Sequence, residues 1–469
     1  MRSVTLRLAV TLALSTCSHA VSSQQDDPSV VPFPFENLED VHLAKRDSSK
    51  TVEAPVVIYG DSYWMNASVG TPPQSLSFLL DLTRSYVDVT YTLDEDYTCS
   101  DDQICSEFGI FKPADSSTFE NLTYRERYEA GVGYSHTDTI TLGDHATDKV
   151  PLEITKVSYY DYSTLSLWSP NTSFPYILVD RGLTTSPSFS LIGDNGATMR
   201  ASILFGGINT SKFNGPLQAF SFADHTITNH PFVTIEADSL ELSTSNNNST
   251  YTIPPSTPML LRTEELITYL PNSTVHPLYT ALNITTDGII SSTRIYGVLP
   301  CARQDTESHT ISIVIRNMTF SVSWDELFVP WTRDGLCKFG IQAQESDYMS
   351  HAELGVPFLR RMYVAVDYNN QFVGVATLKD GDDDDKKEEE EDIVEIGTGT
   401  ALPSAVAVGE WPSSITAYTP AATTGTTEST TQTFTTATSS GGGVVPTAVL
   451  EKRSWLVSGV LGMAVLQAV

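Results

Sequence analysis

The sequence predicts a protein of the all-β class, built mainly from β-strands. Val, Ile, Thr, Tyr and Phe recur in short runs, and these residue types favour strands. The 28 glycines and 25 prolines separate the runs in the way that turns do. The hydrophobic content of 40% over 469 residues is enough to fill one large core or two medium ones.

The charge of the chain limits its partners. The formal net charge is -30 at pH 7. Nucleic acid and anionic membrane surfaces would repel such a chain, so we expect neither as a partner. The histidines form no HExxH pattern, and the chain has no GxSxG nucleophile motif. We therefore expect no metal ion and no cofactor.

The N-terminus has the pattern of a secretory signal. In residues 1–20 the basic residue Arg2 precedes an apolar run that ends in small residues. The run is too short to span a membrane. Residues 21–46 are polar and end in the basic pair Lys45-Arg46. We interpret this pair as the processing site of a short pro-segment; an ordinary exposed basic pair is the alternative.

The cysteine count fits an oxidising compartment. Cys17 leaves with the signal, and the mature chain keeps four cysteines. Four cysteines allow three pairings, of which we expect the one between nearest neighbours, Cys99–Cys105 and Cys301–Cys337. A zinc site is the alternative, and the absence of any CxxC pair disfavours it.

Nine sequons for N-glycosylation are spread through the central region. One sequon alone means little, but nine on a chain with a secretory signal predict a glycosylated surface. The asparagines are Asn66, Asn121, Asn171, Asn209, Asn247, Asn248, Asn272, Asn283 and Asn317.

The composition changes sharply after Lys379, where we expect the folded region to end. Residues 380–395 form an acidic segment that repels itself and cannot pack, so we expect a solvated linker. Residues 396–440 follow as a stalk that is rich in Ser and Thr.

The C-terminus has the order of a signal for a glycosylphosphatidylinositol (GPI) anchor: small residues, a spacer and an apolar tail. We expect attachment near Ser440 and Gly441, with residues 441–469 as the part that is replaced. A short transmembrane anchor is the alternative, but the 16 apolar residues span only about 24 Å of a ~30 Å hydrocarbon core. In either case the chain is tethered outside the cell, at the membrane or in the cell wall.

Several blocks lie in one order along the central region, among them "ASVGTPPQSLSFLLDL", "FPYILVDRGLTTSPSFSL", "TYLP" and "LGVPFLRRMYVAVDYNNQFVGVATLK". This series resembles the pepsin-like aspartic peptidases (peptidase A1), and in particular their yapsin-like, GPI-anchored fungal branch. The resemblance implies a bilobal fold with a few short helices. The N-terminal lobe would cover residues 57–222 and the C-terminal lobe residues 223–379, with a substrate cleft between them.

The resemblance also implies a mechanism. Two catalytic aspartates of the family, one from each lobe, share a proton and activate a water molecule that cleaves a peptide bond. Each aspartate is followed by Thr or Ser and then by Gly. Here Asp81 holds the first position, but Leu82, Thr83 and Arg84 follow it. Ser166 takes the place of a glycine that backs this loop in the family.

The second lobe departs further from the family pattern. In "LLRTEELITYLP", Arg262 stands where the family has its second aspartate, and Glu264 replaces the glycine. The flap that would cover the cleft keeps its tyrosine, Tyr124, but Arg125 and Arg127 stand in its glycine-rich turn.

An arginine cannot perform the chemistry of the lost aspartate. Arginine has only donors and stays charged, so it can neither hold the shared proton nor act as a base. We hypothesise that Asp81 and Arg262 form an ion pair at the lobe junction. Glu264 or Glu265 would supply a second carboxyl group only after a shift in register, and the spacing between "LL" and "TYLP" provides none.

The leading prediction is therefore a catalytically inactive pseudopeptidase, a monomeric cell-surface glycoprotein that binds a ligand or acts in the cell wall. One alternative is an aspartic-type endopeptidase with residual or non-standard activity. Another is a binding module for a polypeptide or a glycan, in which Arg84, Arg125, Arg127 and Arg262 form a basic patch.

Overall fold

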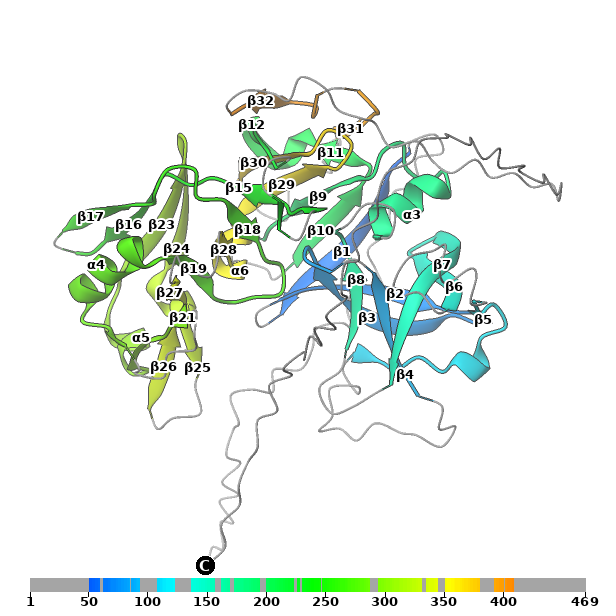
Figure 1. The fold of residues 1–469 in the computed structure, drawn as a ribbon, viewed down its shortest axis with the longest axis horizontal. Coiled ribbons are helices and arrows are strands. Elements are labelled where there is room, and N and C mark those ends of the chain that lie inside the picture. The colour runs from blue at the N-terminus through cyan, green and yellow to red at the C-terminus, as the bar shows by residue number, and fades with distance from the viewer. Residues whose placement is uncertain are drawn as a thin grey trace, which may run out of the picture. The chain divides into compact units, whose positions relative to one another are not determined.

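The fold is that of a computed structural model, drawn in Figure 1. The structure describes residues 50–59, 62–84, 86–92, 108–122, 136–156, 162–168, 173–194, 200–222, 226–227, 230–245, 247–286, 294–330, 335–344, 351–379, 392–399 and 401–408. The predicted signal, pro-segment and anchor signal lie outside these residues, as do Cys99, Cys105, Tyr124, Arg125, Arg127, Asn171, Ser440 and Gly441. Within the described ranges, no helix has both the length and the apolar character that a membrane-crossing segment needs.

The largest sheet has fourteen strands among the described residues. In spatial order they are β32 (Ala405–Ala407), β12 (Phe213–Ser221), β30 (Phe372–Leu378), β29 (Met362–Asp367), β9 (Ser188–Ile192), β10 (Arg200–Phe205), β1 (Val52–Tyr59), β2 (Ser62–Val69), β3 (Gln74–Asp81), β8 (Ser163–Ser166), β4 (Val87–Tyr91), β7 (His145–Lys156), β6 (His136–Leu142) and β5 (Glu120–Asn121). Small two-stranded sheets join β11 (Gly207–Asn209) to β31 (Ile393–Glu395), and β13 (Thr226–Ile227) to β14 (His230–Pro231).

The second half of the chain forms three further sheets. The first has the order β15 (Thr234–Ile235), β18 (Met259–Leu261), β28 (Ala352–Leu354), β19 (Thr268–Pro271), β27 (Ile341–Gln344) and β21 (Arg294–Ile295). The others are β17 (Asn248–Thr252), β16 (Ser239–Ser243), β23 (Thr310–Ile315) and β24 (Met318–Ser323), and β20 (Thr285–Thr286), β22 (Gly297–Pro300), β26 (Leu336–Phe339) and β25 (Phe328–Pro330).

Helices are few and short in the described part of the chain. The α-helices are α3 (Phe174–Asp180), α4 (Asn272–Leu282), α5 (Arg303–Thr306) and α6 (Val356–Leu359), and the 3-10 turns are η2 (Pro113–Asp115), η3 (Thr210–Lys212) and η4 (Trp324–Leu327). The predicted all-β class is therefore confirmed.

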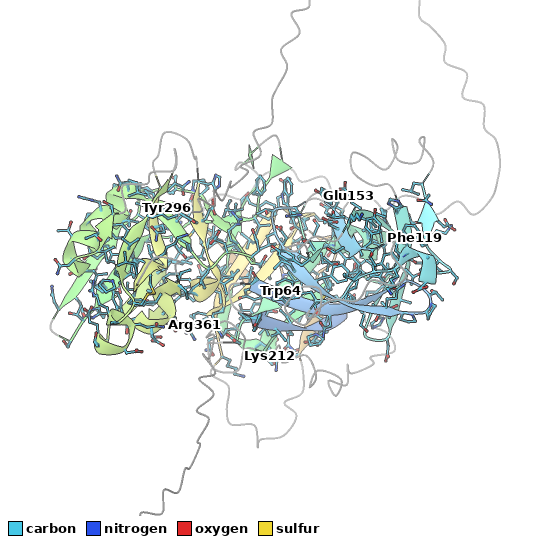
Figure 2. The ribbon with its side chains drawn as sticks, turned by 90° about the horizontal axis from the view of Figure 1, so that it is seen from below. Trp64, Phe119, Glu153, Lys212, Tyr296 and Arg361 are labelled. Atoms are coloured by element: carbon cyan, nitrogen blue, oxygen red, sulfur yellow. A yellow bond between two sulfur atoms is a disulfide. The ribbon has the colours of Figure 1, made fainter. Side chains whose placement is uncertain are left out.

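Burial along the strands follows the residue pattern. The sequence "MTFSVS" of β24 alternates, so Met318, Phe320 and Val322 face the core while the residues between them are exposed. The continuous run "MYVAVD" of β29 is buried at every position, because this strand lies inside the large sheet and is covered on both faces. Trp64, labelled in Figure 2, stacks on Phe108 with ring centroids 4.1 Å apart.

Two parts of the chain repeat one strand arrangement. In the first, β3 pairs in parallel with β8, and β4 pairs antiparallel to β8 and parallel to β7. In the second, β18 pairs in parallel with β28, and β19 pairs antiparallel to β28 and parallel to β27. This repeat defines the two lobes that the resemblance implied. It also makes the ends of β3 and β18 equivalent positions, and these strands lead to Asp81 and Arg262.

The last strands of the predicted second lobe cross into the large sheet. Strand β29 pairs with β9, and β30 pairs with β12, both of which belong to residues 57–222. The sheet is therefore shared between the two halves of the chain. Within the second lobe, the predicted disulfide between Cys301 and Cys337 is confirmed, with 5.1 Å between the Cα atoms.

The folded region does not end at Lys379, and this corrects the predicted boundary of the acidic linker and the stalk. Strand β31 pairs with β11, and β32 pairs in parallel with the edge strand β12, as Figure 1 shows. Ile396 and Leu402 are buried at 0% and 2% exposure. Apolar side chains between the polar runs supply the burial that a solvated linker would lack.

Candidate functional site

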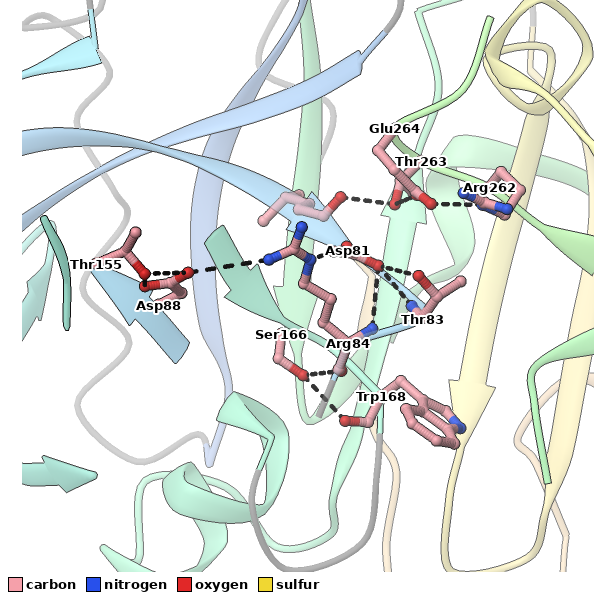
Figure 3. Close-up of polar contacts among 11 residues, drawn as sticks. Asp81, Thr83, Arg84, Asp88, Thr155, Ser166, Trp168, Arg262, Thr263 and Glu264 are labelled. Carbon is pink, nitrogen blue, oxygen red and sulfur yellow. Dashed lines mark hydrogen bonds and ion pairs between the residues drawn. The ribbon is translucent and has the colours of Figure 1, made fainter. Parts of the chain in front are cut away.

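The first loop at the lobe junction begins at the end of β3. Asp81 is 3% exposed, and its carboxylate accepts three hydrogen bonds and forms one ion pair, all within its own loop. Its Oδ1 accepts from the backbone N–H of Thr83 at 2.6 Å, from the Thr83 hydroxyl at 2.6 Å and from the N–H of Arg84 at 3.1 Å. The guanidinium Nε of Arg84 lies 3.2 Å from Oδ2. Figure 3 shows this enclosure of the carboxylate.

The side chain of Arg84 lies between two carboxylates. Besides Asp81, its Nη1 is 3.9 Å from Oδ2 of Asp88 on β4. Asp88 in turn accepts a hydrogen bond of 2.8 Å from the hydroxyl of Thr155 on β7. The Arg84 side chain is 45% exposed, so the pair combines a buried acid with a cation that still reaches solvent.

Ser166 holds the first loop from behind. Its hydroxyl lies in hydrogen-bonding contact with the carbonyl of Arg84 and 3.0 Å from the carbonyl of Trp168. The residue is fully buried, and its neighbour Leu167 donates its N–H to the carbonyl of Asp81 at 2.8 Å. The Ser166 hydroxyl thus supplies a donor beneath the loop.

The second loop follows β18 and is built around Arg262. Its backbone N–H donates to the carbonyl of Leu354 at 3.0 Å. Its guanidinium group contacts Glu264 through Nε and Glu353 through Nη1, the latter at 2.8 Å. Glu353 is 1% exposed and sits on β28, where the parallel register places it opposite Leu260. A buried acid therefore accompanies the arginine on the neighbouring strand.

The expected ion pair between Asp81 and Arg262 is wrong. Each charged group is bound by oppositely charged residues of its own lobe, Asp81 by Arg84 and Arg262 by Glu264 and Glu353. These partners come from the same loop or from the adjacent strand, so pairing needs no contact across the junction.

Two hydrogen bonds of Thr263 join the second loop to strands β2 and β3 of the first lobe. The hydroxyl of Thr263 donates to the carbonyl of Leu80 at 2.7 Å, and the carbonyl of Thr263 accepts from the N–H of Tyr63 at 2.9 Å. Thr263 is fully buried. The equivalent residue of the first loop is Leu82, which has no hydroxyl. It therefore cannot donate the reciprocal side-chain hydrogen bond to the second lobe.

Glu264 is the second carboxyl group near Asp81. Burial and the nearby carboxylate of Asp81 raise the pKa of Glu264 to about 7, although Arg262 opposes the shift. Its Oε2 also lies 3.3 Å from the hydroxyl of Thr263. The sequence spacing predicted that a glutamate would come near Asp81 only after a shift in backbone register. That prediction left out the longer reach of the glutamate side chain.

Neither substituted glycine position strains the backbone. The left-handed non-glycine residues of the described chain are Lys149, Ser256, Asn283, Arg316, Gln371 and Ser404. Thr83 and Glu264 are not among them, so both loops take a shape that ordinary residues adopt.

Arg84 and Arg262 do not form the predicted basic patch by themselves. Each guanidinium group is paired with two carboxylates, so the charge around the junction is acidic on balance among the described residues. Arg125 and Arg127 lie outside the described residues. The described ranges also contain no group of three or more His, Cys, Asp or Glu side chains placed to hold a metal ion.

The repeated lobes and the paired loops at their junction are the features of an aspartyl protease fold. The chain matches the family model of the eukaryotic aspartyl proteases over residues 62–378, and it belongs to this family.

Its relatives include fungal proteins named as aspartic-type endopeptidases and aspartic proteinases. The chain is 26% identical over 451 residues to the "Probable aspartic-type endopeptidase OPSB" of Arthroderma benhamiae, covering 87% of this chain and 88% of the relative. It is 28% identical over 425 residues to the protein of that name in Aspergillus oryzae, covering 84% of each chain. It is 25% identical over 413 residues to "Aspartic proteinase yapsin-3" of Saccharomyces cerevisiae, covering 80% and 78%. The predicted family and its yapsin-like relatives are thus confirmed.

Proposed function

We propose that this chain is a cell-surface member of the aspartyl protease family that binds a polypeptide at the lobe junction and does not hydrolyse it through an aspartate pair. One observation carries the proposal: the carboxylate of Asp81 is already engaged by three hydrogen bonds and by the Arg84 guanidinium group, all from its own loop. The position that should hold its acidic partner is Arg262.

The chemistry of a proton-sharing pair explains why this pairing matters. A catalytic water must donate to a free oxygen of the base, and a neighbouring acid must hold the shared proton. Arg84 lies on Oδ2 of Asp81, the oxygen that the backbone donors leave open. The guanidinium group therefore takes the place at which a catalytic water would donate. General acid–base assistance of about 10²–10⁴-fold would be lost.

The surface location rests on the secretory signal, the sequons and the anchor signal of the sequence. Relatives named yapsin-3 and "Secreted aspartic protease 8" of Candida albicans support an extracellular place. A polypeptide is the ligand favoured, because the chain keeps the two-lobed frame of a peptide-binding family while its chemistry is changed.

Binding without cleavage is the experiment that tests the proposal. The secreted chain is mixed with a peptide library at pH 3–6, captured, and its bound peptides are analysed by mass spectrometry. We expect enriched peptides of intact length, and loss of enrichment in the double variant Asp81→Ala with Arg84→Ala. Arg316→Ala is the matched control, since Arg316 also lies between two acids, Glu236 and Asp238, far along the sequence from the site. Enriched peptides that are all cleavage products would contradict the proposal.

A second candidate is an endopeptidase with a non-standard acid pair. The observation in its favour is Glu264, whose pKa of about 7 would keep a proton on it beside Asp81 in acid. This candidate predicts peptide cleavage that both Asp81→Asn and Glu264→Gln abolish, and that falls as the pH rises through about 7. Cleavage that survives in Glu264→Gln would remove it.

A further inference from the structure

The segment after the acidic run packs on the first lobe, although its composition is typical of unpacked chain. We propose that residues 392–399 and 401–408, named here the docked segment, form a non-covalent tether that holds the folded body to the tail. A cut between residues 380 and 391 would then leave the body attached. This inference is independent of the proposed function, because no residue of the lobe junction takes part.

Backbone pairing fixes both ends of the docked segment. Strand β31 runs antiparallel to β11, with Ile393 opposite Asn209 and Glu395 opposite Gly207. Strand β32 runs parallel to β12, with Ala405 opposite Leu217. These contacts extend beyond the strands, since the N–H of Val408 donates to a carbonyl of β12 at 2.8 Å. The segment thus covers the open edge of the large sheet.

Two apolar side chains of the docked segment close a separate hydrophobic cluster. Ile396 and Leu402 are fully or almost fully buried in it. The other members come from the first lobe and the shared strands: Ile208, Phe213, Leu217, Tyr363, Ala365, Ala376 and Leu378. Leu402 packs directly on Gly374, where an added Cβ would come within 2.7 Å of its Cδ2. This glycine therefore makes room for the segment.

Polar contacts hold the middle and the start of the segment. The N–H of Ile396 donates to the carbonyl of Gly206 at 2.8 Å, and the Ser186 hydroxyl donates to the carbonyl of Ile396 at 2.5 Å. The N–H of Lys50, at the start of the described chain, donates to Oε1 of Glu395 at 2.9 Å. Contacts to three separate parts of the first lobe make the docking specific.

The described residues on either side of the acidic run, Lys379 and Asp392, contact the body at one place. The N–H of Lys379 donates to the carbonyl of Lys212 at 3.0 Å. On the other side, the N–H of Thr210 donates to the carbonyl of Asp392 at 2.9 Å, and its hydroxyl donates to Oδ2 of Asp392 at 2.9 Å. Both contacts are made to η3. A cut between residues 380 and 391 removes none of the contacts described above. Release of the body from its tail would require undocking as well as cleavage.

The test uses the secreted chain with an affinity tag in place of residues 441–469 and a site-specific protease sequence inserted between residues 380 and 391. The protein is cut under native conditions and captured by the tag. We expect the body, which no longer shares a backbone with the tag, to be captured in nearly full yield. Loss of the body from the captured fraction immediately after complete cutting would overturn the inference.

Variants identify the contacts that retain the body. The pair Ile396→Asp and Leu402→Asp should release the body after cutting and leave capture of the uncut chain unchanged. Val406→Asp is the matched control, because Val406 lies in the same segment and its side chain is 51% exposed. Release by this control to the same extent would overturn the assigned contacts. If the double variant is not secreted, excess peptide of sequence 392–408 is added to the cut wild-type protein, and it should accelerate loss of the body. Docking is also supported if the peptide has no effect, provided that the body is fully retained in native buffer and is lost at once in mild denaturant.

Discussion

The guanidinium group of Arg84 pairs with the carboxylate of Asp81 at 3.2 Å, three residues away in the same loop. Arg262, which follows β18 as Asp81 ends β3, pairs instead with Glu264 and Glu353. The junction therefore contains two charge networks, one in each lobe. Each network sets one guanidinium group against two carboxylates, so both Asp81 and Arg262 have a charged partner within their own lobe.

Arg262→Asp should destabilise the protein and not restore an enzyme. The change removes the cation from two buried acids and adds a third, and breaking a buried ion pair typically costs about 3–5 kcal/mol. Adding Glu353→Leu should recover much of that loss, because Glu353 is the acid on the adjacent strand. Denaturant unfolding of the single and double variants measures both effects.

Arg316→Asp is the control for this series. Arg316 also lies between two acids, Glu236 and Asp238, but its side chain is 34% exposed. Screened surface pairs contribute about 1 kcal/mol or less, so the variant should be close to wild type. Equal losses at Arg262 and Arg316 would contradict the buried network.

Thr263→Val should weaken the connection between the lobes. The change removes the hydroxyl that donates to the Leu80 carbonyl. Losing this hydrogen bond should lower the free energy of unfolding by about 1–3 kcal/mol. Thr280→Val is the matched control, because the Thr280 hydroxyl makes an exposed bond to His276 within one helix. In thermal unfolding, Thr263→Val should lower the melting temperature more than Thr280→Val does. A larger decrease for Thr280→Val would refute the role of the cross-lobe bond.

The stability of the protein should fall as the pH rises from about 4.5 to about 7. Burial and Asp81 raise the pKa of Glu264 from 4.5 to about 7, so the folded state holds this proton more tightly than the unfolded chain does. The stabilisation is complete below the unfolded pKa and is lost as the pH passes the folded pKa. Across that window it is on the order of a few kcal/mol.

Glu264→Gln tests this source of pH dependence. The variant should flatten the fall in unfolding free energy between pH 4.5 and 7. A smaller slope should remain, because burial also raises the pKa of Asp367 from 3.8 to about 6. An unchanged slope in the variant would show that Glu264 does not titrate in this range.

Asn209 should stay without a glycan in the folded protein. Its side chain is 1% exposed, and its Oδ1 accepts from the N–H and the hydroxyl of Ser211 in its own sequon. The Nδ2 atom that would carry a glycan is enclosed. Asn121, Asn247 and Asn317 are exposed and serve as positive controls in glycopeptide mass spectrometry. Complete occupancy at Asn209 would contradict the described packing.

Sequence reasoning located the altered site but not the partners of its charged residues. The resemblance predicted equivalent positions for Asp81 and Arg262, and in the structure these residues stand at the ends of β3 and β18, which pair in the same way in their sheets. The partner Glu353 lies 91 residues beyond Arg262 and reaches it only through the parallel register of β18 and β28. One signal was present: a glutamate inside the apolar block "AELGVPF" indicates a buried acid that needs a cation.

The docked segment was missed for a different reason. Average composition after residue 379 is acidic and then rich in Ser and Thr, which is typical of unpacked chain. The strands form from short apolar runs, "IVEI" and "ALPSAVAV", that such averages conceal. Pairing to a distant sheet edge depends on tertiary structure, so no local pattern could assign it.

The most direct test of the central claim is hydrolysis of a mixed peptide library by the secreted chain at pH 3–6, compared with its Asp81→Asn variant. We predict that neither protein cleaves the library above the buffer background, because Asp81 is held by Arg84 and faces no second aspartate. Cleavage by the wild type that a pepstatin-type inhibitor stops, and that Asp81→Asn lacks, would contradict the account.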